Sequence, residues 1–151
     1  MSKIAVIILT SVSVMVPVLA RQSAQDHPDN DPHVRFAPLH VYVDSDNRPL
    51  AAFQFELKTT DGQIKIVGVE GGEHQAFKDA PYYDPAALAK DRIIIAAFST
   101  AGDLPNARTR IATVHLQIVG EARPEYELRL TVAADAHGQE IPAKISYEEG
   151  E

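Results

Sequence analysis

The sequence contains no cysteine and no tryptophan. The first absence excludes several kinds of site, and the second limits what can fill a core. Without cysteine there is no disulfide, no thiol nucleophile and no Cys-ligated metal site. Because there are only five Phe and five Tyr, a core must be filled mainly by Val, Ile, Leu and Ala. The composition is 45% hydrophobic and 23% charged over 151 residues. This is typical of a globular protein, and the length suits one domain.

Basic residues are also scarce. The chain has 14 Lys and Arg against 21 Asp and Glu, which gives a formal net charge of −7. Such a surface repels nucleic acid and anionic lipid, so we predict no nucleic-acid partner.

Residues 1–20 have the layout of a secretory signal peptide. Lys3 precedes an uncharged apolar stretch over residues 4–20, which ends in small residues at Ala20, the predicted cleavage site. An uncleaved membrane anchor is the alternative, because this stretch is at the short end of the roughly 17–25 residues that span a bilayer. A cleaved leader predicts a chain that is secreted, or held in the periplasm or cell envelope, with no membrane insertion. An exported chain without cysteine needs a core large enough to fold without disulfides.

Composition divides the rest of the chain into three parts. Residues 21–35 are polar, contain two prolines and lack apolar periodicity, so we predict a disordered linker. Residues 36–147 are predicted to form one folded domain. Residues 148–151 are predicted to be an acidic tail.

Apolar residues recur at every second position through most of the predicted domain. Strict alternation over four to eight residues is typical of half-buried β-strands. Short strands separated by Gly, Pro, Asp and Asn favour an antiparallel sandwich or barrel. The residues predicted to face the core are Leu39, Val41, Val43, Ala51, Phe53, Phe55, Leu57, Ala112, Val114, Leu116, Ile118, Tyr126, Leu128, Leu130, Val132, Ile141, Ala143, Ile145 and Tyr147.

Two local signals predict connections between these strands. Asp44, Asp46 and Asn47 are typical of an Asx-type turn, and we expect it to close a hairpin. One short helix is expected after Asp84, which suits an N-cap, with Pro85 as the first helical residue.

The stretch RIIIAAF, residues 92–98, is apolar at nearly every position and predicts a central strand covered on both faces. The residues predicted to face the core are Ile93, Ile95 and Ala97. Those predicted to face away from it are Ile94, Ala96 and Phe98. Either a loop over residues 71–85 or a partner protein would cover that second face. We expect the loop, because large exposed apolar patches are uncommon on monomers.

Several segments resemble the cohesin domain, the secreted β-sandwich module of cellulosomes and related bacterial proteins. They are HVYVD, LAAFQFELK, IKIVGVEGG, RIIIAAFSTAGDLPN, TRIATVHLQIVG and LRLTVAADAHGQEIPAKIS, in that order. The resemblance implies a jelly-roll-like two-layer sandwich of about nine strands. It also implies non-catalytic binding of a dockerin on one sheet face, in the setting of polysaccharide degradation.

The sequence carries no motif for catalysis. It has no G-x-S-x-G elbow, no H-E-x-x-H and no P-loop, and Glu56 and Glu127 occupy outward strand positions where a solvated charge is expected. We therefore predict neither an enzyme nor a cofactor.

Metal binding is not predicted either. Residues 26–33, DHPDNDPH, contain possible ligands, but their composition favours a solvated linker. A calcium loop that begins at Asp44 would need Gly and Glu where Pro49 and Phe55 stand. A calcium site built from distant parts of the chain stays open.

The residues predicted to bind a partner are Ile94, Ala96, Phe98, His115, Gln117, Tyr82 and Tyr83. His115 and Gln117 are expected on an outward face beside Ile111 and Thr113, which is either a docking surface or an ordinary wet sheet face. The two tyrosines suit an anchor for protein or sugar, or one of them closes the end of the sandwich. We predict a protein partner of the dockerin type. The alternatives are a carbohydrate-binding module that uses Tyr82 and Tyr83 as a platform for sugar rings, and a structural envelope protein.

Overall fold

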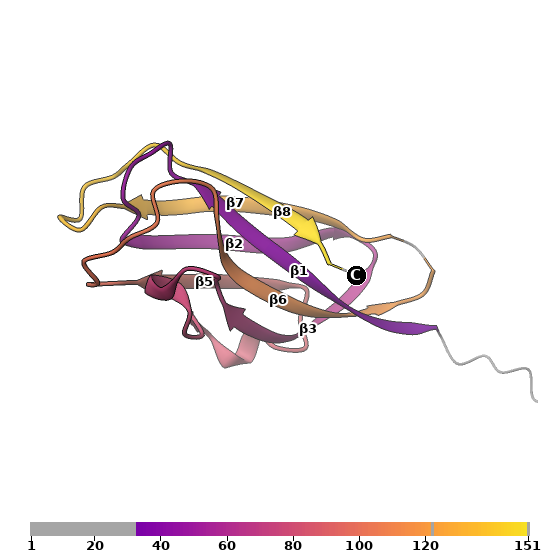
Figure 1. The fold of residues 1–151 in the computed structure, drawn as a ribbon. Helices are drawn as coiled ribbons and strands as arrows, with labels where there is room; N and C mark the ends of the chain where they lie inside the picture. The colour runs from indigo at the N-terminus through magenta and orange to yellow at the C-terminus, as the bar shows by residue number, and fades with distance from the viewer. Residues whose placement is uncertain (1–32, 122, 151) are drawn as a thin grey trace, which may run out of the picture. The chain divides into compact units, whose positions relative to one another are not determined.

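The alternating segments form eight β-strands in the part of the chain that the computed structural model describes, residues 33–121 and 123–150 (Figure 1). The strands are β1 (Val34–Asp44), β2 (Ala52–Asp61), β3 (Gln63–Gly71), β4 (Tyr82–Tyr83), β5 (Arg92–Phe98), β6 (Thr109–Val119), β7 (Glu125–Ala134) and β8 (Lys144–Glu149). The predicted leader and nearly all of the predicted linker lie outside the described residues. Within the described ranges, no helix is long and apolar enough to cross a membrane.

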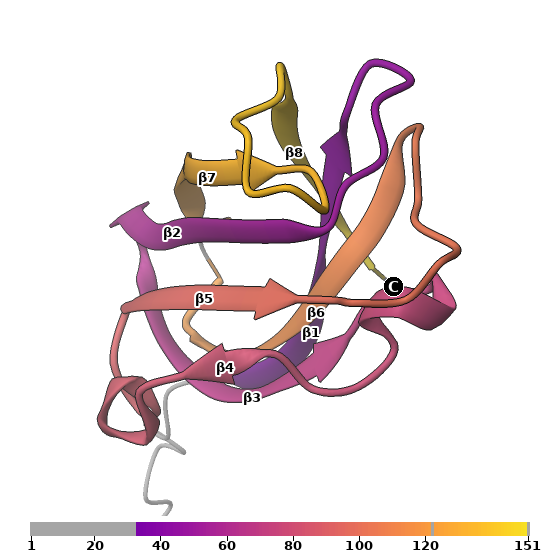
Figure 2. The same cartoon turned by 90° about the vertical axis from the view of Figure 1, so that its left-hand side faces the viewer.

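The strands form two four-stranded sheets, in the orders β3–β6–β1–β8 and β4–β5–β2–β7. Every strand pair is antiparallel. Figure 2 shows the β4–β5–β2–β7 layer crossing the second layer obliquely. The predicted all-β, two-layer antiparallel sandwich is confirmed.

The strand count is eight, whereas the family resemblance implied about nine. The segment between β7 and β8 makes a turn and a single isolated bridge, from Ala134 to Glu140. Pro142 has no N–H group to donate to a ladder, so the strand predicted from Ile141 begins only at Lys144.

Almost every connection carries the chain from one sheet to the other, and only the connection from β4 to β5 stays within a sheet. The Asx turn between β1 and β2 is present, because the Asp46 N–H lies 3.1 Å from Asp44 Oδ1. The expectation of a hairpin there is wrong, since β1 and β2 belong to different sheets. Except for β4 and β5, strands that pair are therefore not consecutive in the sequence, as β1 is far from β6 and β8.

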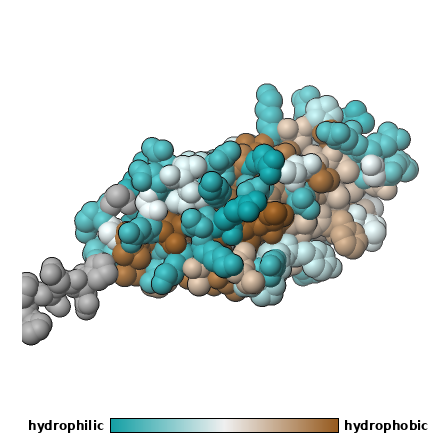
Figure 3. Space-filling model, turned by 180° about the vertical axis from the view of Figure 1, so that it is seen from behind, coloured by the Kyte–Doolittle hydropathy of each residue, from teal (hydrophilic) through white to brown (hydrophobic). Residues whose placement is uncertain are grey.

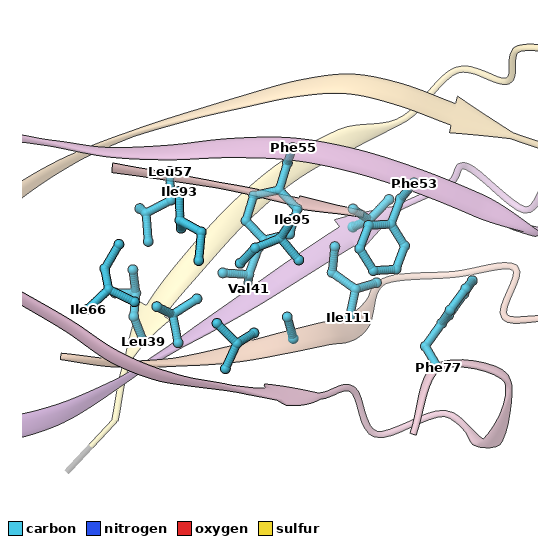
Figure 4. Close-up of a cluster of buried hydrophobic side chains, with 14 of the residues drawn as sticks. Leu39, Val41, Phe53, Phe55, Leu57, Ile66, Phe77, Ile93, Ile95 and Ile111 are labelled. Carbon is cyan, nitrogen blue, oxygen red and sulfur yellow. The ribbon is translucent and has the colours of Figure 1, made fainter. Parts of the chain in front are cut away.

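The core lies between the two sheets and consists mostly of aliphatic side chains. Phe53, Phe55 and Leu57 of β2 are fully buried, as predicted, and point toward the opposite sheet (Figure 4). Phe77 closes one end of this cluster, with its ring edge-on to Phe53 at 5.1 Å between centroids. Ile93 is also buried, so the predicted core-facing side of β5 is confirmed.

Two of the β-bulges overturn core positions that the alternation predicted. In β6, Ala112 lies opposite Val41 and Arg110 opposite Tyr42, so Ile111 is the extra residue. Ile111 is fully buried, although the sequence placed it on the outer face. A bulge of this kind reverses the alternation, which a fixed period of two cannot predict.

The second bulge lies in β7. Val132 lies opposite Gln54 and Leu130 opposite Phe55, so the residue between them is extra. As a result Val132, predicted to face the core, is 42% exposed and Ala133 is buried in its place.

The limits of the folded domain extend beyond the predicted ones. β1 begins at Val34, two residues before the expected start. Glu148 and Glu149 belong to β8 and are not a tail. Each is paired with an arginine, Glu148 with Arg108 at 2.7 Å and Glu149 with Arg123 at 3.0 Å.

The predicted helix is a single 3₁₀ turn, η2 (Pro85–Ala87). The Asp84 carboxylate caps it by accepting a hydrogen bond from Ala86 N at 2.9 Å, as the sequence predicted. A second 3₁₀ turn, η1 (Gln75–Phe77), was not predicted.

Gly71 lets the chain fold back tightly after β3. A Cβ at this position would lie 2.2 Å from the carbonyl oxygen of Lys78 and 2.5 Å from that of Asp79, on the segment that leads to β4. Both neighbours are backbone atoms, so they cannot yield by a rotamer change.

We expect Gly71→Ala to lower the free energy of unfolding by about 2 kcal/mol, because the added methyl group forces the two backbone segments apart. Gly102→Ala is the control, since a Cβ there has no neighbour within 4 Å, and it should change the stability by less than about 1 kcal/mol. Urea denaturation of both variants measures the difference. Equal stabilities would contradict the close approach at Gly71.

Candidate docking face

The outer face of the β4–β5–β2–β7 sheet is apolar around β5. Ile94, Ala96 and Phe98 alternate with the buried residues of this strand and point away from the core, and Ile94 is 47% and Phe98 65% exposed. The predicted lid over them is wrong. Residues 71–85 include η1 and β4, and β4 extends the sheet at its edge without covering this face.

The two predicted tyrosines point to opposite sides of the sheet. Tyr82 lies opposite Ala96 on the outer face and is 68% exposed. Its ring stacks on Phe98, with 6.1 Å between the centroids and 8° between the planes. Tyr83 lies opposite Ile95 and packs against the core. Only Tyr82 is therefore placed to meet a partner on this face.

Residues of β2 and β7 extend this apolar surface across the sheet. Ala52 lies opposite Phe98, and Val132 lies two strands away from Ala96, on the far side of Gln54. The Gln54 amide is held within the sheet, because its Nε2 donates to the Thr131 hydroxyl at 3.1 Å. We call the resulting surface the apolar patch. It consists of Ala52, Tyr82, Ile94, Ala96, Phe98 and Val132. Figure 3, seen from behind, shows brown apolar surface next to teal hydrophilic side chains.

Charged residues occupy the remainder of the same face. They form what we call the charged strip, which consists of Glu56, Lys58, Arg92, Glu127 and Arg129. Glu56 lies opposite both Ile94 and Arg129, so the strip begins where the apolar patch ends. The face thus has an apolar half and a charged half.

Glu56 is the centre of the charged strip. Its carboxylate accepts hydrogen bonds from Arg92 Nε and from Arg129 Nη2, the latter at 2.7 Å. The Glu56 side chain is only 13% exposed, whereas those of Arg92 and Arg129 are 56% and 66% exposed. The hydrogen bonds from Arg92 and then Arg129 lower the pKa of Glu56 to about 2.

His115 and Gln117 lie on the other sheet, on the outer face of β6. His115 Nε2 is 3.1 Å from a carboxylate oxygen of Glu70. Phe36, opposite Gln117, is 70% exposed. Around His115 lies a shallow hollow lined by residues of β1, β3 and β6. The seven residues predicted to bind a partner therefore do not form one surface, because four lie in the apolar patch, two on this opposite face and Tyr83 against the core.

No group of three or more His, Asp or Glu side chains is arranged to hold a metal ion among residues 33–121 and 123–150. The Asp44 carboxylate caps its own turn at Asp46 N. The possible ligands upstream of His33 lie outside the described residues.

Comparison with known proteins gives no relative from which a function could be transferred. No protein-family model matches the chain, and no curated protein or solved structure is significantly similar to it. The fold and its surfaces are therefore the basis for the functional proposal.

We expect the ion pairs of Glu56 to make stability depend on acid pH. The pKa of this carboxyl falls from an ordinary value of 4.5 to about 2 on folding, so its contribution is complete above about pH 4.5 and is lost as the pH falls toward 2. Glu56→Gln should be less stable than the wild type at pH 7, and most of the difference should be lost by about pH 2.

Glu127→Gln is the matched control, because Glu127 is an exposed glutamate on the next strand that makes no ion pair with any described residue. Denaturant melts across this pH range provide the measurement. A difference between wild type and Glu56→Gln that does not change with pH would contradict the role given to the two arginines.

Proposed function

We propose that this chain is an exported, non-catalytic binding protein of the cohesin-like type, and that the outer face of the β4–β5–β2–β7 sheet docks a protein partner. The observation that carries the proposal is the apolar patch. Its four large side chains are 42% to 68% exposed, and no segment among the described residues covers them. Contiguous exposed apolar surface on a soluble domain is typical of an interaction site.

The make-up of the face favours a protein as the ligand. Interfaces typically combine an aromatic and aliphatic centre with a polar rim. Here Tyr82, stacked on Phe98, provides such a centre, and the charged strip provides the rim. Stacked rings lose little conformational freedom on binding, so more of the contact energy is available for affinity.

Sequence features support two further parts of the proposal, export and a dockerin-type partner. The apolar leader favours export to the cell envelope or the medium. The segments that resemble cohesins favour a dockerin-type partner, since cohesins bind dockerins on one sheet face. A folded sandwich with an apolar sheet face is compatible with export and with a dockerin-type partner.

Carbohydrate binding is the competing function. The predicted platform of Tyr82 with Tyr83 is not formed, because Tyr83 packs against the core. The Tyr82 and Phe98 rings instead make an aromatic pair on the outer face. Binding of the protein to polysaccharides is therefore measured in addition to the capture of a protein partner.

We expect residues 21–151, immobilised as bait, to capture a protein from the secreted and envelope fractions of the producing organism. Phe98→Ala and Tyr82→Ala should each weaken the identified complex by about tenfold or more, as truncation of a central aromatic residue does. Phe36→Ala is the control, an exposed phenylalanine on the opposite sheet. Titration calorimetry with the purified partner gives the dissociation constants.

Two outcomes would change the proposal. Loss of the partner with Phe36→Ala but not with Phe98→Ala would move the site to the other sheet. Binding of the wild type to cellulose or chitin, abolished by Tyr82→Ala, together with no captured protein, would favour the carbohydrate-binding function.

A further inference from the structure

The charged strip adjoins the apolar patch so closely that one ligand can contact both. Glu56, Ile94 and Arg129 stand in one row across β5, β2 and β7. The adjacent row contains Ala96, Gln54 and Val132, all on the same face. A protein seated on the apolar patch would therefore bring its own side chains over the two arginines.

The two guanidinium groups keep most of their hydrogen-bonding capacity. An arginine has five N–H donors. Arg92 uses Nε and Arg129 uses Nη2 to bind Glu56. Both side chains remain more than half exposed, so the remaining donors are accessible to a ligand.

The sign of the local charge differs from that of the whole chain. The charged strip combines three cationic side chains with two carboxylates, and one of these carboxylates, Glu56, is covered by the arginines. The chain as a whole has a formal net charge of −7. A carboxylate is thus attracted to the two arginine side chains themselves, although other acidic residues, such as Asp91 next to Arg92, and the protein as a whole repel it.

Glu56 also holds the two arginines in place. It lies on β2, between the strands that carry them, and all five residues of the charged strip line a hollow of about 270 Å³. Side chains that are already fixed lose less entropy when they bind. A planar guanidinium matches the two oxygens of a carboxylate, so the arrangement suits a carboxylate more than a single hydroxyl or amide.

We propose that the charged strip selects the partner. Arg92 and Arg129, held by Glu56, bind Asp or Glu side chains that the partner presents beside its apolar contact surface. The partner is therefore a polypeptide with an acidic margin next to apolar residues. This inference rests on the proposed docking function and adds two specificity-determining residues to it.

A purely structural role for the same ion pairs makes a different prediction. If the arginines only tie β5, β2 and β7 together, replacing them changes stability and leaves ligand choice unaltered. Ligand choice is therefore the property to measure, at a temperature well below the thermal melt of every variant, so that all of them are folded.

The experiment is selection from a phage-displayed random-peptide library on four immobilised baits at low ionic strength. The baits are the wild type, Arg92→Gln/Arg129→Gln, Phe98→Asp and Arg108→Gln. The last is the matched control, because Arg108 pairs with Glu148 of β8 in the other sheet. Selected peptides are then synthesised, and their dissociation constants are measured against every bait at low and high salt.

We expect the peptides selected on the wild-type bait to combine apolar residues with Asp or Glu. They should bind the double variant about tenfold more weakly, since each exposed ion pair typically changes affinity by about two- to five-fold. Their affinity should fall with added salt and stay unchanged for Arg108→Gln.

Two results would overturn the proposed role of the charged strip. Peptides without acidic residues, or acidic peptides that bind the double variant as well as the wild type, would remove the role of the arginines and leave docking on the apolar patch intact. No enrichment on the wild type relative to Phe98→Asp would remove both this inference and the proposed docking function.

Discussion

The constraint on which the rest of the structure depends is that β5 is apolar on both sides while only one side can enter the core. Ile93 and Ile95 pack between the sheets and are fully buried. A strand alternates strictly, so burying them forces Ile94 and Phe98 outward. With a sheet on one side only, nothing within the sandwich covers this second set. The apolar patch is thus a direct consequence of the composition of one strand, and the neighbouring strands either extend it or limit it.

The patch is also built by residues that the fold gathers from distant parts of the chain. Tyr82 comes from a two-residue strand, Ala52 from β2 and Val132 from β7. Val132 faces outward only because a bulge in β7 reverses the alternation. Since nearly every connection crosses between the sheets, no short segment contains this surface. It exists only when the four strands of this sheet have paired, and pairing between strands so far apart in sequence is intrinsically slow.

The sequence predicted those features that depend on local order. Alternation identified the core side of β1, β2 and β5, and the Asp84 cap follows from a short-range preference. The features it missed depend on pairing between distant strands. Glu56 and Arg129 are 73 positions apart, and only the register of β2 with β7 brings them together. Likewise, His115 and Phe98 are both outward residues of neighbouring strands in the chain, and sequence order cannot tell that they belong to different sheets.

The outer faces of the two sheets also differ in how well they suit a ligand, and the difference favours the face around β5 as the docking surface. On the other sheet, His115 is next to Glu70 and the exposed phenylalanine stands beside Gln117, so polar groups interrupt the apolar surface. Around β5 the polar Gln54 is tied to Thr131 within the sheet, and its two cross-strand partners, Ala96 and Val132, are apolar. Charge is displaced to one end, where Glu56 neutralises part of it. An apolar surface with charge at one end gives a ligand both contact area and a preferred orientation, which an evenly mixed face cannot provide.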